Sequence, residues 1–240
     1  MNKVLPALMI AIMIAGFAFA VPPHEKNDRS PLEKITFIHY KKGFAKPGGN
    51  ERPSGTACYL FLAKGTKWIA PEPYYINPTN SQGIPESLVT SSANLGASQW
   101  DSQVTATIFG AASTDYNASY NNGNLDGKNT LSFGVISDTG AIAVTNVWGY
   151  FSGPVQTRQI IEWDMLLDQG DFSWGDATID SGKMDVQNII THELGHSAGM
   201  GDLYQSGCSQ ETMYGYSTEG ETKKRDLNTG DITGIKKLYG

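Results

Sequence analysis

Two of the four histidines in this 240-residue chain stand four positions apart. They are His192 and His196, and Glu193 directly follows the first of them. Apolar residues recur around them at helical spacing, so both imidazoles should lie on one face of a helix, about 6 Å apart. That spacing suits two nitrogen ligands of a tetrahedral zinc ion, and it places Glu193 to reach a water molecule instead of the metal.

A third candidate ligand follows, because Gly199 and Asp202 extend the pattern to HELGHSAGMGD. Gly199 can adopt the positive φ that ends a helix sharply, and the chain can then turn back so that Asp202 supplies an oxygen ligand. Two nitrogens and one oxygen leave a fourth position for water, which is typical of a catalytic zinc site. The alternative is a buried helix with two ordinary core histidines, which would leave half of the histidines aligned by coincidence.

The elements that must position these residues can be read from periodicity and turn residues. One folded domain over 58–240 is expected, with strands followed by late helices, which indicates an α/β or α+β fold. Helices are predicted at 85–100, 185–198 and 229–238. Strands are predicted at 59–63, 66–69, 74–76, 105–109, 131–136, 141–148 and 159–167.

The first twenty residues predict export. Lys3 precedes a nearly unbroken apolar run from Leu5 to Phe19, and Ala18 and Ala20 are the small residues that a signal peptidase reads. We expect cleavage after Ala20, a secreted chain and no stable membrane association afterwards. An uncleaved membrane anchor is the alternative, because the stretch from Val4 to Val21 is just long enough to span a bilayer.

Residues 21–57 are interpreted as an N-terminal extension or a short pro-segment. They are rich in proline, glycine and charge, although 34–40 could form an isolated strand. Cys58 and Cys208 are the only cysteines, and in an oxidising compartment they are expected to form a disulfide. A free Cys58 with a chemical role is the alternative.

The charge balance excludes one class of partner. The chain has 18 basic and 24 acidic residues, a formal net charge of −6, and therefore no basic surplus to neutralise phosphate. Nucleic acid is not an expected partner.

The motif HExxHxxGxxD, followed by Thr212-Met213-Tyr214, resembles the metzincin metalloproteases and in particular their matrixin-like branch. Three further stretches are similar to the first core strand, the last sheet strand and the closing helix of those enzymes. They are KWIAPEPYYINPTN (67–80), IIEWDMLL (160–167) and LNTGDITGIKKLYG (227–240). Most members have histidine as the third ligand where this chain has Asp202, although some bacterial branches use aspartate.

The resemblance implies an α+β catalytic domain. Its mixed, twisted sheet of about five strands would pack with two long helices, and a small irregular C-terminal subdomain would end in a helix. It also implies a secreted zinc-dependent endopeptidase with one catalytic zinc, Glu193 as the general base, and Met213 as apolar support beneath the ligands. The alternative is a secreted, zinc-containing binding or adhesion module on the same fold, without proteolytic turnover.

The resemblance further places the substrate, a protein or peptide, antiparallel to an edge strand above the zinc helix. The candidate is 140–147, and 217–228 would form a wall of the pocket just past the scissile bond. The strand residues named for this role are Ala141, Ile142, Ala143, Val144 and Thr145. A monomer is expected.

Other metals and latency are open in the sequence. Outside the motif only His24 and His39 remain, so a second, structural zinc is not expected. The loops 115–129 and 168–180 are oxygen-rich and could hold calcium, although such stretches are more often turns. Matrixins often carry a pro-segment cysteine that blocks the zinc, but the surroundings of Cys58 do not match that motif, which favours the disulfide.

Overall fold

The computed structural model describes residues 30–44 and 57–240, so the predicted signal segment lies outside the described residues. Its main sheet has seven strands in the order β3-β2-β4-β6-β5-β1-β9. The strands are β1 (Glu33–Lys41), β2 (Glu72–Ile76), β3 (Phe109–Thr114), β4 (Asn129–Gly134), β5 (Ala141–Tyr150), β6 (Gln159–Asp168) and β9 (Tyr216–Ser217), while β7 (Trp174–Gly175) and β8 (Met184–Asp185) form a separate pair. The helices are α1 (Glu86–Asp101), α2 (Val186–Ser197) and α3 (Thr229–Tyr239), with short 3₁₀ turns at Asn121–Gly123, Val155–Thr157, Ser206–Cys208 and Lys223–Arg225.

The sheet is mixed, as predicted. β2, β3, β4 and β6 run parallel to one another, and β5 is antiparallel to both β6 and β1. Strands β2 to β6 correspond to five of the expected strands, and the α+β prediction is confirmed. The strands expected at 59–63 and 66–69 are wrong, because this segment is a loop whose backbone bonds to the turn after α2 (Leu62 N–H to the Gly199 carbonyl) instead of to a sheet strand along its length. The strand expected at 105–109 forms instead at Phe109–Thr114, where it pairs with β2.

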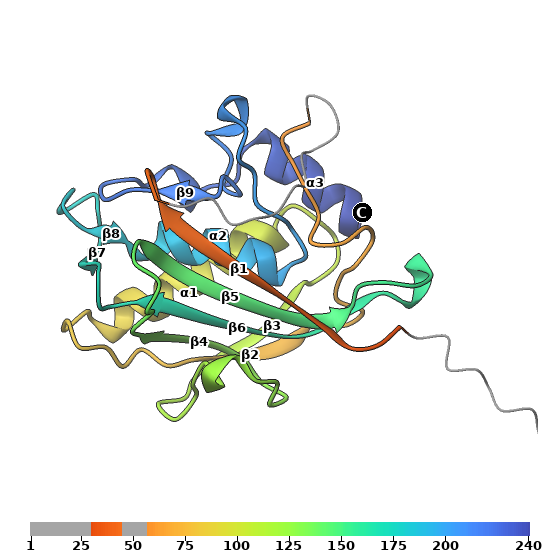
Figure 1. Cartoon of the computed structure of the whole chain (residues 1–240), viewed down its shortest axis with the longest axis horizontal. Coiled ribbons are helices and arrows are strands. Elements are labelled where there is room, and N and C mark those ends of the chain that lie inside the picture. Colours follow the sequence, from red (N-terminus) through yellow and green to blue (C-terminus); the bar gives the residue numbers. More distant parts are fainter. Residues whose placement is uncertain (1–29, 45–56) are drawn as a thin grey trace, which may run out of the picture.

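The strand that the sequence suggested at 34–40 is not isolated. As β1 it joins the main sheet, pairing along β5 on one side and with β9 on the other (Figure 1). A strand at a sheet edge presents unpaired backbone groups, so an extended segment gains a full ladder of hydrogen bonds there. Local sequence cannot reveal such a partner, because β5 lies about a hundred positions further along the chain.

Helix α2 follows from its own sequence. The side chain of Asp185 accepts a hydrogen bond from the Asn188 amide at 2.8 Å and so caps the first turn. Its apolar residues Val186, Ile189, Ile190 and Leu194 are all fully buried, as their spacing predicts. The helix packs against α1, which covers the same face of the sheet (Figure 1).

The C-terminal part is irregular until α3. Asn228 and Asp231 form a reciprocal capping box at the start of this helix. A disulfide joins Cys58 to Cys208 and so ties the start of the domain to the segment just before α3. Within the described residues no helix is long and apolar enough to cross a membrane.

Candidate metal centre and active site

The two motif histidines lie one turn apart on α2. Their rings are nearly perpendicular, with centroids 4.9 Å apart. Gly199, with φ of 103°, turns the chain back after the helix. This turn brings Asp202 Oδ1 to 3.3 Å from His192 Nε2 and 3.4 Å from His196 Nε2. The three residues that the sequence named as ligands therefore meet, with one ligand atom of each within 4.8 Å of the other two.

Backbone carbonyls orient both rings. His192 Nδ1 lies 2.7 Å from the carbonyl oxygen of Thr212, and His196 Nδ1 lies 3.0 Å from that of Met200. Because a carbonyl only accepts hydrogen bonds, each Nδ1 must carry the proton of its ring. Each Nε2 therefore turns a lone pair inward, which is the form that a metal ligand needs.

The three inward atoms fit a metal cation. His192 Nε2, His196 Nε2 and Asp202 Oδ1 are buried and have no hydrogen-bond partner among the described residues. Three acceptors that face one another are unfavourable unless a cation or a proton lies between them. Two imidazole nitrogens and one carboxylate oxygen, with a position left over, form a donor set that suits catalytic zinc.

The electrostatics of the three groups agree with such a site. Burial acts to raise the pKa of Asp202, but His196 and His192 outweigh it and hold that pKa below its usual range. Burial lowers the pKa of His192 to about 3. Burial also acts to lower the pKa of His196, yet Asp202 outweighs it and the pKa rises. The cluster thus attracts one positive charge, which a bound metal ion would supply.

Glu193 lies beside this cluster and not within it. Its Oε1 is 3.9 Å from His192 Nε2, and Thr145 Oγ1 donates a hydrogen bond to its Oε2 at 2.7 Å. The side chain is fully buried, and this burial raises the pKa of Glu193 to about 7. A carboxyl group with a pKa near neutrality can both accept and return a proton, which is what general acid–base catalysis needs.

Met213 packs directly beneath the helix that carries the ligands. A Cβ on Gly195 would lie only 2.2 Å from Met213 Sδ, so the glycine between the histidines lets the methionine approach. The turn is held by α3, because the amides of Thr212 and Met213 donate to the carboxylate of Asp231 at 2.6 and 3.1 Å. The Thr212 carbonyl in turn orients His192. A chain of hydrogen bonds therefore connects α3 to the three proposed ligands, His192, His196 and Asp202, which are called the metal cluster below.

The model of the family described as Matrixin (peptidase family M10) matches residues 95–240, which includes all of these residues. The chain belongs to the matrixin family. It is also similar to "Metalloendoproteinase 1-MMP" of Arabidopsis thaliana, with 41% identity over 58 residues. That alignment covers 24% of this chain and 15% of the relative, so this match concerns only a short part of that protein.

In this matrixin, β1 covers the edge strand that the resemblance assigned to the substrate. It pairs antiparallel with β5, with Tyr40 opposite Ala141, His39 opposite Ala143, and Phe37 opposite Thr145. Val144 faces Ile38, and the register shift between His39 and Tyr40 leaves Ile142 without a direct partner on β1. Figure 1 shows β1 running along β5 in front of α2. The candidate substrate edge of the matrixin site is therefore occupied by this chain's own N-terminal strand.

Two side chains of β1 cover the metal cluster. The ring of Phe37 stacks on the ring of His196, with a centroid distance of 3.8 Å and an interplanar angle of 8°. The ring of His39 lies 3.9 Å from that of His192, and His39 Nδ1 is 3.0 Å from Glu193 Oε1. Burial lowers the pKa of His39 well below its ordinary value, so this imidazole is neutral.

The loop over 217–228 adds a buried cation on the other side of His39. Lys224 Nζ lies 3.0 Å from His39 Nε2 and donates to the carbonyls of Tyr214 and Tyr216. Burial lowers the pKa of Lys224 to about 8. Since the ammonium group can only donate, His39 Nε2 accepts, and His39 Nδ1 donates to Glu193.

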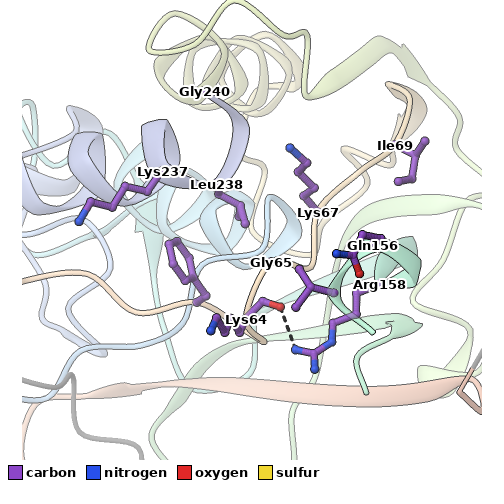
Figure 2. Close-up of a pocket in the computed structure, with 11 residues that line it drawn as sticks. Lys64, Gly65, Lys67, Ile69, Gln156, Arg158, Lys237, Leu238 and Gly240 are labelled. Carbon is purple, nitrogen blue, oxygen red and sulfur yellow. Dashed lines mark hydrogen bonds between the residues drawn. The ribbon is translucent and has the colours of Figure 1, made fainter. Parts of the chain in front are cut away.

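A separate cavity lies away from this site. It has a volume of about 500 Å³ and is lined by Lys64, Lys67, Arg158 and Lys237 among others, with none of the metal-cluster residues (Figure 2). Arg158 donates to the carbonyl of Lys64 across it. The buried ligand atoms without partners converge at His192, His196 and Asp202 and not in this cavity.

Sequence reasoning missed the roles of Phe37, His39 and Lys224 in this site. The sequence alone indicates only an extension over 21–57, and Lys224 is one of several charged residues in 217–228. One signal was present: in KITFIHYK (34–41) alternate residues share a face, which puts Phe37 and one of only four histidines side by side.

Proposed function

We propose that this matrixin is a secreted zinc-dependent endopeptidase that hydrolyses peptide bonds of proteins. The observation that carries the proposal is the convergence of three unpartnered, buried ligand atoms beside a buried carboxyl group with a pKa near neutrality. His192, His196 and Asp202 would hold the zinc ion. When bound, zinc supplies Lewis acidity toward the scissile carbonyl and toward water.

The chain's own residues supply the proton transfers. Glu193 would take a proton from the attacking water and pass it to the nitrogen of the leaving amine. The hydrogen bond from Thr145 Oγ1 fixes one carboxylate oxygen, so the other oxygen, Oε1, is the one free to move the proton once His39 is gone. Met213 would keep α2 at the required depth by packing against Gly195.

The substrate backbone would take the place of β1. In this proposal residues 141–145 pair with an extended peptide, and β9 borders it on the other side, as it now borders Tyr40 and Lys41. The ladder of backbone hydrogen bonds provides affinity without sequence preference, and inward side chains provide selectivity.

Residues 21–57 would accordingly be a pro-segment that keeps the enzyme latent. The support is the position of β1 over the ligands: β1 pairs along the edge of β5, Phe37 stacks on His196, and His39 is hydrogen-bonded to Glu193. The segment that precedes Cys58 could be removed without loss of the domain, because the disulfide anchors Cys58 to Cys208.

Secretion and a monomeric state complete the proposal. The predicted signal segment at 1–20 and the disulfide both favour an oxidising, extracellular compartment.

In the loops 115–129 and 168–180, where the sequence allows calcium, several aspartates stabilise local turns. Asp115 and Asp126 each accept a hydrogen bond from an amide two residues further on, and Asp168 accepts from the amides of Gly170 and Asp171. Calcium binding in these loops stays a prediction of the sequence.

The test uses the full chain with Phe37→Ala and His39→Ala, which loosen β1, in the presence and absence of Glu193→Ala. Casein hydrolysis and zinc content by atomic absorption are measured for each protein. We expect zinc in all of them and hydrolysis only where Glu193 is intact. Zinc in all of the proteins with hydrolysis in none of them would favour the binding-module alternative, and absence of zinc would refute the ligand assignment.

A further inference from the structure

The two carboxylate oxygens of Asp202 have different surroundings. Oδ1 faces both imidazoles of the metal cluster, at 3.3 and 3.4 Å, and has no hydrogen-bond partner among the described residues. Oδ2 instead lies 3.2 Å from the hydroxyl oxygen of Tyr204. Because a carboxylate only accepts hydrogen bonds, the phenol of Tyr204 is the donor. This bond holds Oδ2 and leaves Oδ1 as the oxygen that faces the proposed metal position.

The turn that carries Met213 also positions Tyr204. The Leu203 amide donates to the Met213 carbonyl, and the Leu203 carbonyl accepts from the Gly215 amide, each at 2.8 Å. Gly215 lies against the phenol, because a Cβ at this position would come within 2.5 Å of ring atom Cε1 and 2.9 Å of the hydroxyl oxygen. The ring of Tyr216 meets that of Tyr204 edge to face, with centroids 5.3 Å apart. The phenol is therefore fixed beside Asp202 by packing on the ring as well as by its hydrogen bond.

An aspartate ligand needs a restraint that a histidine ligand does not. An imidazole turns one nitrogen to a metal ion, whereas a carboxylate can bind through one oxygen or through both. A catalytic zinc site has three protein ligands and keeps one position for water or substrate. If Oδ2 of Asp202 also turned toward the ion, it would crowd that position. The turn would break the bond to Tyr204, a partly buried phenol, and the loss of this acceptor is unfavourable.

We infer that Tyr204 is a positioning residue that keeps Asp202 a one-oxygen ligand through Oδ1 and so preserves the open position of the site. This inference rests on the proposed function and extends the site to a residue outside the three ligands. The role of Tyr204 is exerted through Asp202 and does not require contact with substrate. Hydrogen-bond partners of metal ligands commonly orient them in this way, and their loss weakens metal binding.

The first experiment removes only the hydroxyl group. Tyr204→Phe keeps the ring between Gly215 and Tyr216, and the full chain is loaded with Co²⁺ in place of zinc. Four-coordinate Co²⁺ absorbs visible light more strongly than five-coordinate Co²⁺, so the intensity reports how many ligand atoms surround the ion. We expect the visible bands of Tyr204→Phe to lose intensity, because Oδ2 is free to join the ion. A spectrum identical to that of the parent overturns the inference.

Zinc affinity, measured by competition with a chelator, should fall roughly tenfold in the same variant. Tyr116→Phe is the matched control, because the Tyr116 hydroxyl donates to Glu86 Oε2 at 2.9 Å on the exposed surface. It removes the same kind of bond outside the metal cluster and should change neither the cobalt spectrum nor the affinity.

A second variant displaces the phenol without removing its hydroxyl group. In Gly215→Ala the new Cβ would crowd the ring of Tyr204, so the hydroxyl must move away from Oδ2. We expect the same loss of cobalt intensity as in Tyr204→Phe. Intensity that falls in both variants, and not in Tyr116→Phe, supports the inference.

Hydrolysis separates this inference from the endopeptidase proposal. The full chain carrying Phe37→Ala and His39→Ala is assayed on casein with and without Tyr204→Phe, and we expect kcat/KM to fall roughly tenfold. Hydrolysis by the protein with Tyr204 intact, together with an unchanged cobalt spectrum in Tyr204→Phe, overturns the inference and leaves the endopeptidase proposal standing. No hydrolysis by either protein, together with the expected spectral change, overturns the endopeptidase proposal and supports the role of Tyr204.

Discussion

Nδ1 of His39 lies 3.0 Å from Oε1 of Glu193, across 154 positions of sequence. The other ring nitrogen, Nε2, accepts a hydrogen bond from Lys224 Nζ, so Nδ1 carries the ring proton and donates to the carboxylate. The proposed general base is therefore hydrogen-bonded on both oxygens, by Thr145 and by His39, while β1 is in place. While β1 is in place, His39 therefore contacts Oε1, the oxygen that Thr145 leaves for the water to be deprotonated.

Loosening β1 should activate the full chain. With Phe37→Ala and His39→Ala, β1 loses the two side chains that seat it on the metal cluster, and we expect casein hydrolysis to rise at least about tenfold. Ile38→Ala is the matched control, because it shortens a side chain of the same strand that faces the other side of the sheet. If Ile38→Ala activates as strongly, seating by Phe37 and His39 is not the cause of latency.

Neutralising the third ligand should weaken zinc binding. Asp202→Asn keeps the shape of the side chain but removes the negative charge that faces both imidazoles at 3.3 and 3.4 Å. We expect zinc affinity to fall at least about tenfold, measured by competition with a chelator. Asp171→Asn, in a loop away from the cluster, serves as the control and should leave affinity unchanged. Unchanged affinity in Asp202→Asn would show that Asp202 is not a ligand.

A buried carboxyl group far from the metal cluster should make stability depend on pH. Burial, with Glu162 and Asp126 adding to it, raises the pKa of Asp164 to about 8. Because the folded-state pKa lies above the unfolded value, this group stabilises the fold below about pH 4, and that contribution is lost as the pH rises toward 8.

Asp164→Asn cannot ionise and should escape this loss. We expect the variant to gain at least about 2 kcal/mol over the parent in the free energy of unfolding between pH 4 and pH 8. Urea denaturation at several pH values measures the gap. A difference that stays constant across this range would mean that Asp164 ionises normally in the folded protein.

Adding one methyl group to the metal helix should disturb the Met turn. In Gly195→Ala the new Cβ would lie 2.2 Å from Met213 Sδ and 2.6 Å from a ring carbon of Trp100, so the methionine or the helix must move. We expect a loss of about 1–3 kcal/mol in stability, as for overpacking elsewhere, together with weaker zinc binding. Adding Met213→Ala to Gly195→Ala should relieve the crowding. The double variant should therefore lose less free energy of unfolding than the two single variants lose together, and an equal or larger loss would contradict this account.

Much of this protein is determined by sequence over short distances. The four-residue spacing of His192 and His196, the glycine turn and Asp202 predict a metal site because one helix and one turn place all three. The apolar spacing of α2 predicts its buried face, and the order of elements predicts the α+β class, which the structure confirms.

Only the tertiary structure decided what lies over that site. From sequence, β1 is only a short strand without a partner. The edge of β5 with which it pairs lies about a hundred positions away, and backbone pairing leaves no signature in the sequence. His39 and Lys224 are separated by 185 positions, and neither residue type indicates the other. Burial explains why these residues contact each other. A lysine and a histidine excluded from water need hydrogen-bond partners, and here His39 pairs with both Lys224 and Glu193.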